Sequence, residues 1–508
     1  MDKQPVARKN FEVFLLVAVF IIATCGLIYE LVAGALASYL LGDSVRQFSF
    51  VIGIYLFSMG VGSYLAKYIT KDLIDRFIDV ELLIGIIGGS SAVVLFLLFQ
   101  HVEHFQFVLY FFVFLTGCLC GMEIPLLMNI LKDRVKFSDL VSNVFAFDYI
   151  GALIASVLFP ILLLPKLGVM GTSLFFGMIN ILVGIALCIY LKNDLKRPKQ
   201  MLSKALLCFF ALVVMFIFSD QLMDYSESKL YSNSIIYKNS TQYQRIVLTE
   251  DKGNYQLFLN NNLQFNTKDE YRYHEVLVHP PMSITKKPEK ILVLGGGDGL
   301  AVREVLKYPT VKKVTLVDLD EGMTKLFQTN EMLVQHNLNS LNDSRVDVIN
   351  ADAFIWVKEN KSKYDVIIVD FPDPSNYSLG KLYTTNFYRA LKESMHESTV
   401  VSVQTTSPYF APKSYWCVQE TIASIYPNTL PYHTYVPSFG EWGFSLFSPN
   451  MQINLNRVNH RVEGLKYYNY QFEKLTEFSE DMGPREVEIN RLDNQILVRY
   501  FDEEWSKI

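Results

Sequence analysis

The sequence has 508 residues with a formal net charge of −5, and 51% of the residues are hydrophobic. This length exceeds one ordinary hydrophobic core and predicts two to four domains. The weak negative charge, without a basic patch after about residue 220, argues against a nucleic-acid partner.

Long apolar runs dominate the sequence before about residue 220, whereas the remainder is mixed and rich in turns. A bilayer-spanning helix needs about 20 mostly apolar residues. Seven candidate spans lie near residues 11–33, 47–66, 81–99, 106–130, 145–165, 168–191 and 204–219. We therefore predict an α-helical, multi-pass bundle in the cell membrane over residues 1–222, with the lipid bilayer as its partner.

Five of the six cysteines lie in this apolar part, and Cys417 follows it. No disulfide can therefore form within the second half of one chain. Cys118 and Cys120 lie inside an apolar run without a nearby histidine cluster, so they are expected to be small buried residues. No metal site is predicted.

Lysine and arginine concentrate in alternate loops of the apolar part: Lys3, Arg8 and Lys9; Lys67, Lys71 and Arg76; Lys132, Arg134 and Lys136; Lys192, Lys196, Arg197 and Lys199. The positive-inside rule places the N-terminus in the cytoplasm. Seven spans would then place the second half outside, whereas the supply of the substrate inferred below favours the cytoplasm. We expect a cytoplasmic catalytic domain, and the span count stays open.

Three carboxylates lie within the apolar runs, namely Glu30, Glu123 and Asp148. An ionisable group in a bilayer is costly, which favours a functional hypothesis such as binding of a cationic amine inside the bundle. The alternative is that each carboxylate lies near a span end or hydrogen-bonds a neighbouring helix.

Short strands with turns are predicted over residues 231–282, and "DKGN" (Asp251–Asn254) between two alternating apolar runs indicates a β-hairpin. We place a β-strand subdomain at residues 223–285. From "KILVLGGGDG" onward, strands alternate with helical stretches, which indicates a doubly wound, mostly parallel sheet. Residues 286–508 are therefore predicted to form an α/β Rossmann-like domain of the class I methyltransferase type.

Acidic residues follow four of these predicted strands: Asp298, Asp318 with Asp320, Asp352, and Asp370 with Asp373. The loop "GGGDG" resembles a phosphate-binding turn, but the carboxylate of Asp298 would repel a phosphate. Asp318 closes the second strand about twenty residues after the glycine turn, where an acid can accept hydrogen bonds from ribose hydroxyls. The pattern argues against a phosphate at the glycine turn and gives Asp318 the role of binding a ribose.

The second half resembles a known family through the segments "YQRIVL", "LQFNTKDEYRYHEVLVHPPM", "LVLGGGDGLAVREVLKYP", "VTLVDLDEGM", "NADAFIW" and "YDVIIVDFPDPSN". In this order they are similar to the polyamine aminopropyltransferases, or spermidine synthases, in their membrane-attached bacterial form. The apolar half is similar to the multi-span module of some members through "GLIYELVAGALASYLLG" and "GMEIPLL".

The resemblance implies transfer of a 3-aminopropyl group from decarboxylated S-adenosylmethionine, as co-substrate, to an amine such as putrescine. The products would be spermidine and methylthioadenosine, and no permanently bound cofactor is implied. Asp370 matches the proton acceptor. Residues that match the amine and aminopropyl pocket are Tyr273, His274, Asp298 and Asp373. Residues that match the nucleoside side are Gln244, Gln264, Gly295, Gly297, Asp318, Asp352 and Ala353. The resemblance also implies a homodimer or a higher homo-oligomer.

Two segments need separate interpretation. "YVPSFGEWGF" (Tyr435–Phe444) departs from the family's usual amine-pocket loop, so the identity of the acceptor does not carry over. His279, which is followed by Pro280 and Pro281, is expected to be a turn residue.

Three other functions remain as alternatives. The first is an S-adenosylmethionine-dependent methyltransferase on the same fold, which Asp298 and the "DFPDP" turn disfavour. The second is a membrane transporter or sensor of polyamines, which the carboxylates of the apolar half motivate. The third is aminopropylation of a membrane amine, such as an aminolipid.

Overall fold

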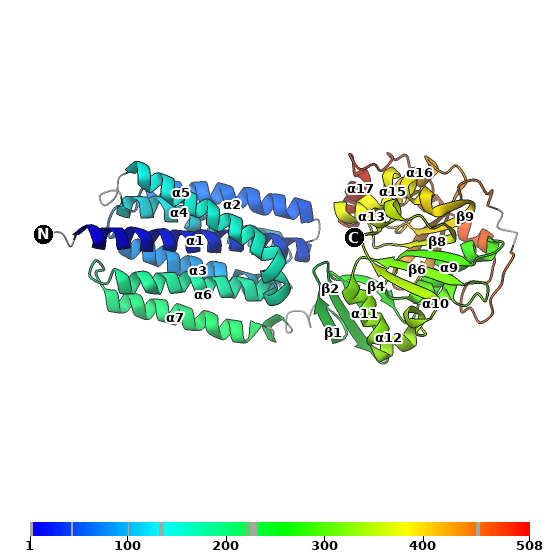
Figure 1. Ribbon diagram of the computed structural model, residues 1–508, viewed down its shortest axis with the longest axis horizontal. Helices are drawn as coiled ribbons and strands as arrows, with labels where there is room; N and C mark the ends of the chain where they lie inside the picture. Colours follow the sequence, from blue (N-terminus) through cyan, green and yellow to red (C-terminus); the bar gives the residue numbers. More distant parts are fainter. Residues whose placement is uncertain are drawn as a thin grey trace. The chain divides into compact units, whose positions relative to one another are not determined.

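The computed structural model describes residues 4–41, 44–99, 101–131, 137–219, 221–223, 231–453 and 458–507. The loop cations Lys3, Lys132, Arg134 and Lys136 lie outside these residues. The chain forms two compact units, Met1–Asn233 and Ser234–Ile508 (Figure 1).

The first unit is a bundle of long helices that lie side by side (Figure 1). Its elements are α1 (Gln4–Leu41), α2 (Ser44–Ala66), α3 (Leu73–Phe99), α4 (Phe105–Leu131), α5 (Phe137–Leu158), the π-helical turn η1 (Phe159–Leu163), α6 (Leu164–Tyr190) and α7 (Pro198–Ile217). In the described part of the chain, six helical segments are long and apolar enough to cross a membrane.

The predicted number of spans was seven, and the difference has a local cause. The predicted spans 145–165 and 168–191 fall within one segment of 49 residues, Ser142–Tyr190. A straight helix of that length would measure about 73 Å, far more than the roughly 30 Å of a bilayer core. Gly168 interrupts the helix with φ 65° and ψ −177°. The chain reverses direction near this point, so α5 and α6 run in opposite directions (Figure 1).

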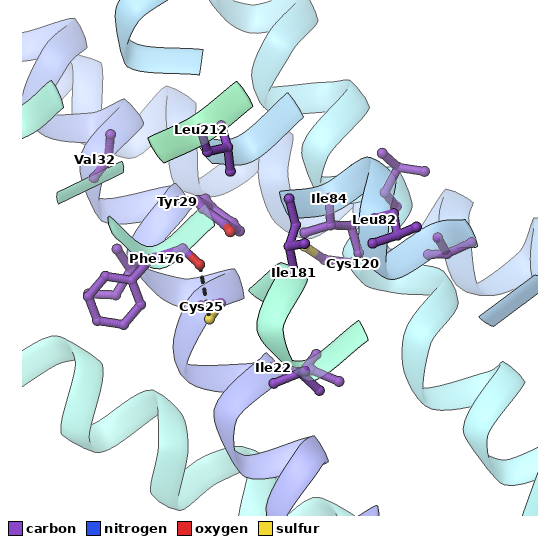
Figure 2. Packing of buried hydrophobic residues seen from close by; sticks show 14 of the residues in the cluster. Ile22, Cys25, Tyr29, Val32, Leu82, Ile84, Cys120, Phe176, Ile181 and Leu212 are labelled. Carbon is purple, nitrogen blue, oxygen red and sulfur yellow. Dashed lines mark hydrogen bonds between the residues drawn. The ribbon is translucent and has the colours of Figure 1, made fainter. Parts of the chain in front are cut away.

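Glycines allow the helices of this bundle to approach closely. A Cβ atom on Gly62 of α2 would lie 1.8 Å from the backbone oxygen of Cys118 in α4. One on Gly177 of α6 would lie 2.7 Å from the backbone oxygen of Gly85 in α3. Small residues at such crossings are typical of helices that pack in membranes. Figure 2 shows buried side chains of several helices that meet in the interior, among them Ile22, Tyr29, Leu82, Ile181 and Leu212.

The second unit begins with an antiparallel sheet in the order β1-β2-β3-β4. Its strands are β1 (Ser234–Ser240), β2 (Arg245–Asp251), β3 (Asn254–Leu259) and β4 (Asn262–Asn266). Lys252 and Gly253 make the predicted hairpin turn, with φ of 52° and 80°. Two consecutive positive φ angles match the twist of the flanking strands. Helix α9 (Glu270–Ile284) follows this sheet.

The rest of the second unit is a sheet in the order β10-β11-β9-β8-β5-β6-β7. Its strands are β5 (Lys290–Gly295), β6 (Lys313–Asp318), β7 (Val346–Asn350), β8 (Tyr364–Asp370), β9 (Met395–Gln404), β10 (Thr429–Val436) and β11 (Gly440–Phe447). Strands β5 to β9 pair in parallel, whereas β10 and β11 are antiparallel. This is the predicted Rossmann-like fold.

Helices cover both faces of this sheet (Figure 1). They are α10 (Leu300–Val305), α11 (Glu321–Thr329), α12 (Glu331–His336), α13 (Ala353–Glu359), α14 (Tyr377–Gly380), α15 (Thr385–Leu391), α16 (Pro412–Ala423) and α17 (Ile496–Trp505). Because side chains alternate along a strand, β5 serves two hydrophobic cores. Ile291 and Val293 belong to the core shared with α9 to α11, and Leu292 and Leu294 to the core shared with α13 and α15.

Candidate active site

The predicted site residues gather where the strand order reverses, between β5 and β8. Gly295 at the end of β5 pairs in register with Asp370 at the end of β8. A Cβ on Gly295 would lie 2.2 Å from the backbone oxygen of Asp370, and Gly295 and Gly296 have φ of 79° and 67°. The glycine turn can pass over Asp370 only without side chains. In open α/β sheets, ligands bind at such a switch point.

Asp318 lies next to this turn, at the end of β6. Its carboxylate accepts hydrogen bonds from the N–H of Gly297 at 3.0 Å and from the N–H of Asp320 at 2.9 Å. A Cβ on Gly297 would lie 2.8 Å from this carboxylate. Burial raises the pKa of Asp318 to about 6, although both hydrogen bonds act in the opposite direction. The structure therefore brings the carboxylate of Asp318 next to the glycine turn.

Asp298 lies in the glycine turn directly before Gly299, the N-cap of α10. Its Oδ1 accepts the N–H of Leu300 at 2.9 Å, and its backbone oxygen accepts Nδ2 of Asn337 at 3.1 Å. Burial raises the pKa of its carboxyl group, and the charge of His274 lowers it. Asp298 thus contributes to local structure as well as to the charge of the site.

Asp370 is held by a side chain of α9. The hydroxyl of Tyr273 donates a hydrogen bond of 2.5 Å to Oδ1 of Asp370. Burial raises the pKa of Asp370 to about 6; the charge of His274 opposes this rise, and the charge of Asp298 adds to it. Burial and Asp370 also raise the pKa of Tyr273 well above its usual value, so the phenol remains a hydrogen-bond donor.

His274 adds one positive charge to this group of acids. Its Nδ1 lies 2.7 Å from Oε2 of Glu270. Burial opposes protonation, but the hydrogen bond and charge of Glu270, with the charges of Asp298 and Asp370, raise the pKa of His274 to about 9. The ring is therefore an imidazolium at neutral pH.

Asp373 follows β8 and is partly buried in the site. Its Oδ1 has no hydrogen-bond partner among the described residues. Burial raises the pKa of Asp373 to about 7. This carboxylate can accept a hydrogen bond from a cationic ligand without breaking an existing contact.

Gln404 is a site residue that the sequence analysis missed. It ends β9, and its Nε2 donates to Tyr383 Oη at 2.7 Å and to the backbone oxygen of Phe371 at 2.5 Å. Its Oε1 accepts Nε1 of Trp442 at 3.2 Å. Trp442 belongs to the segment Tyr435–Phe444, so this segment contacts Gln404. The sequence signal for Gln404 is a polar residue after the apolar run "VVSV", but the expected site residues at strand ends were all acids.

The predicted nucleoside residues are only partly brought together. Asp352 accepts the N–H of Phe354 at 2.8 Å and Nζ of Lys381 at 2.6 Å, and Ala353 begins α13 beside it. Residues of the four-stranded sheet contact other groups. Gln244 donates to Asp320 Oδ2 at 2.8 Å, which joins β6 to the small sheet. Gln264 donates to the backbone oxygen of Asn262, on its own strand, at 3.2 Å.

A buried ion pair fixes α9 against α10, and sequence reasoning missed it. Arg303 donates from Nη1 and Nη2 to both carboxylate oxygens of Glu270, at 2.9 and 3.0 Å. Its Nε donates to Glu304 at 2.9 Å. Burial disfavours the charge of Glu270, but hydrogen bonds from His274 and His336 and the charge of Arg303 hold its pKa well below its usual range.

The expectation that His279 is a turn residue is wrong. His279 is fully buried inside α9, with Nε2 at 2.9 Å from Glu304 and Nδ1 at 2.9 Å from the hydroxyl of Tyr308. These tertiary contacts outweigh the local tendency of Pro280 and Pro281 to end a helix. His279 therefore extends the same buried network.

These features define a Rossmann-like enzyme site for a nucleoside and a cation. Within the described residues, no group of three or more His, Cys, Asp or Glu side chains could hold a metal ion.

The "Spermine/spermidine synthase domain" family model matches residues 270–457. A "Polyamine aminopropyltransferase" of Leptospira interrogans is 51% identical, over 97% of this chain and 99% of that protein. A "Polyamine aminopropyltransferase 1" of Ralstonia nicotianae is 48% identical, over 99% of this chain and 97% of that protein.

A solved structure, "Crystal Structure of Spermidine Synthase in Complex with Transition State Analogue AdoDATO", aligns with 54% of this chain and 89% of that chain at 26% identity and a TM-score of 0.46. The full-length identities decide the assignment. This chain belongs to the polyamine aminopropyltransferase, or spermidine synthase, family. It is an aminopropyltransferase, and the family uses decarboxylated S-adenosylmethionine as co-substrate. The predicted homo-oligomer stays a prediction.

We expect Glu270→Gln to lower the free energy of unfolding of the second unit by about 3 kcal/mol, because it removes the two-point partner of the buried guanidinium of Arg303 and leaves only the contact of its Nε with Glu304. All four tryptophans, Trp356, Trp416, Trp442 and Trp505, lie in this unit. Tryptophan fluorescence during urea unfolding of the full chain therefore reports on it.

The matched control for this experiment is Glu321→Gln. Glu321 pairs with Lys325 at 2.6 Å, but both side chains are more than 60% exposed. An exposed pair contributes less than about 1 kcal/mol, so the control is expected to unfold almost like the wild type. Equal losses in both variants would contradict a structural role for the Glu270–Arg303 pair.

Proposed function

We propose that this enzyme transfers the aminopropyl group to a small diamine, with putrescine as acceptor and spermidine as product. The observation that carries the proposal is the excess of negative charge on buried and partly buried carboxylates at the switch point. Asp298, Asp370 and Asp373 lie there. The charge of His274 acts on Asp298 and Asp370, that of Arg303 acts on Asp298, and Asp373 keeps an unpaired oxygen. Ammonium groups of both substrates would balance these charges.

The same charge distinguishes the donor from ordinary S-adenosylmethionine. The nucleoside would lie toward Asp318 and Asp352, and the aminopropyl ammonium toward Asp298 and Asp373. Ordinary S-adenosylmethionine carries a carboxylate at that end of the molecule, which these acids would repel. This argument disfavours methyl transfer.

Asp370 is the proposed proton acceptor. An ammonium has no lone pair, so the acceptor nitrogen first gives a proton to the carboxylate of Asp370. The freed lone pair forms a bond to the methylene carbon beside the sulfonium. The carbon–sulfur bond breaks, its electron pair goes to sulfur, and neutral methylthioadenosine leaves. Tyr273 orients the carboxylate through its 2.5 Å hydrogen bond.

For Asp370→Asn we expect methylthioadenosine release to fall about 10²- to 10⁴-fold, the usual contribution of a general base. Binding of decarboxylated S-adenosylmethionine, measured by calorimetry, is expected to persist because Asp318 and Asp352 are unchanged. Asp347→Asn is the matched control, since Asp347 is exposed and pairs with Lys313 on the surface. Loss of donor binding together with activity would contradict the role of Asp370 as the base.

The pH dependence of kcat/KM for the diamine separates this mechanism from one without a base. Asp370 must be ionised to take the proton and Asp373 to hold an ammonium, and their pKa values are about 6 and about 7. We therefore expect a plateau above about pH 8, a decline through pH 7 as Asp373 is protonated, and a steeper decline below pH 6 as Asp370 is protonated as well. A tenfold rise per pH unit that continues to the pKa of the free amine would instead show capture of the neutral diamine from solution.

We also propose that the first unit crosses the cell membrane and that the catalytic unit faces the cytoplasm, where its donor is supplied. Six apolar helical segments support membrane insertion. A cytoplasmic N-terminus and catalytic unit require an even number of crossings. Helix α7 is the candidate for incomplete crossing: after Lys204, which pairs with Asp79 at 2.6 Å, 13 residues remain to its end, about 20 Å.

Reporter fusions at the two ends of the full chain test this arrangement. We expect a cytoplasm-active reporter to work at both the N-terminus and the C-terminus, and a reporter that needs export to fail at both. Opposite results at the two ends would show an odd number of crossings and would place the catalytic unit outside the cytoplasm.

A further inference from the structure

The helical unit contains a second set of buried carboxylates that the aminopropyl transfer does not use. Glu81 of α3 is 0% exposed and Glu123 of α4 is 8% exposed. The sequence analysis singled out Glu123 but not Glu81, which stood at the edge of a predicted span. Glu30 and Asp148 are only partly buried.

Glu81 is held in place by a neighbouring helix. Nδ2 of Asn180 in α6 donates to the backbone oxygen of Glu81 at 2.8 Å and to its Oε2 at 3.1 Å. The glycine contacts between α3 and α6 hold these two helices close together, with Gly89 of α3 facing Gly177. The position of the carboxylate is therefore set by the fold before any ligand arrives.

Four polar atoms in this region have no hydrogen-bond partner among the described residues: Oε1 of Glu81, Oε1 of Glu123, Oδ1 of Asn180 and the hydroxyl oxygen of Tyr29. Tyr29 is 2% exposed, lies in the middle of the helix packing (Figure 2) and interacts electrostatically with both glutamates. All four atoms can accept a hydrogen bond. Burying polar atoms without hydrogen bonds in an apolar interior costs free energy. These four atoms therefore need a hydrogen-bond donor from outside the described residues.

The charge of the region is also unbalanced. The charged neighbours of Glu123 are Glu81 and Asp148, both acids. Neither glutamate forms an ion pair with a lysine or arginine in the described part of the chain. Each glutamate lies eight residues from the helix end on the same side of the bundle, about 12 Å deep. Two carboxylates at this depth need protons or a cation.

We propose that Glu81, Glu123, Asn180 and Tyr29 form a binding site for the ammonium group of a small aliphatic amine inside the helical unit. An ammonium brings one positive charge and three N–H donors. The site offers two carboxylates and four acceptor atoms without donors. This site is separate from the catalytic site, whose residues all lie in Ser234–Ile508.

Spermidine is the probe for the first test, and the full chain is used in nanodiscs whose lipids carry no primary amine. In equilibrium dialysis without donor, we expect two spermidine molecules per wild-type chain, one in each unit. The double variant Glu81→Gln/Glu123→Gln is expected to bind one. Glu30→Gln is the matched control, because Glu30 is a partly buried carboxylate of the same unit, and it should still bind two.

The proposal would be overturned by equal stoichiometries in the wild type and the double variant, which would mean that the glutamates hold only protons. Displacement of the second spermidine by phosphatidylethanolamine would also overturn it, in favour of a lipid headgroup. Methylthioadenosine release by the double variant is expected to be unchanged, since its catalytic residues are intact.

A second measurement needs no variant and covers the case in which the double variant does not fold. A hydrophobic carbodiimide modifies protonated carboxyl groups in apolar surroundings, and mass spectrometry locates the adducts. On the wild-type chain we expect spermidine to protect Glu81 and Glu123 but not Glu30. Modification of Glu81 and Glu123 at equal rates with and without spermidine would contradict an amine site at these residues.

Discussion

The ion pair between Glu270 and Arg303 is the contact on which the catalytic site depends. It joins α9, which carries Tyr273 and His274, to α10, which follows the glycine turn. The same carboxylate keeps His274 protonated. One buried contact therefore sets both the position of two site residues and the charge of one of them. Such a pair is costly to desolvate, and its two-point geometry and further hydrogen bonds compensate for that cost.

Around this contact, the site collects more negative charge than it neutralises. Lys381 pairs with Asp352, and His274 acts on Asp298 and Asp370, but Oδ1 of Asp373 has no hydrogen-bond partner among the described residues. The pKa values of Asp298, Asp370 and Asp373 are raised chiefly because burial disfavours the charged form, and the charge of Asp298 adds to the rise at Asp370. A site of this kind stores an unfavourable energy that a cationic substrate relieves. The site therefore favours cationic substrates over substrates that carry a carboxylate. This preference fits a donor that has lost its carboxylate.

Local signals in the sequence were sufficient for the fold and for part of the site. Alternating strands and helices gave the order of elements, and a glycine turn followed by acids at strand ends marked the switch point. Two buried contacts could not be predicted, because the sequence near each residue does not indicate its partner. They join Glu270 to Arg303, 33 residues apart, and Glu81 to Asn180, 99 residues apart. Gln404 was not predicted as a site residue, because an amide side chain at the end of a strand does not by itself indicate a functional site. The prediction for His279 was wrong for the opposite reason. Its two following prolines are a local signal for a turn, but contacts with residues distant in the sequence keep it inside a helix.

The two units solve the problem of buried carboxylates in different ways. In the catalytic unit, Tyr273 donates to Asp370 and His274 supplies a charge, so the acids are partly satisfied within the fold. In the helical unit, Asn180 donates to Glu81, and its own Oδ1 remains without a partner. A structural role alone would favour apolar residues at these positions, because well-packed apolar side chains stabilise a buried site at least as well as an unsatisfied polar group. The glutamates therefore point to a ligand of the helical unit itself, independent of the chemistry at Asp370.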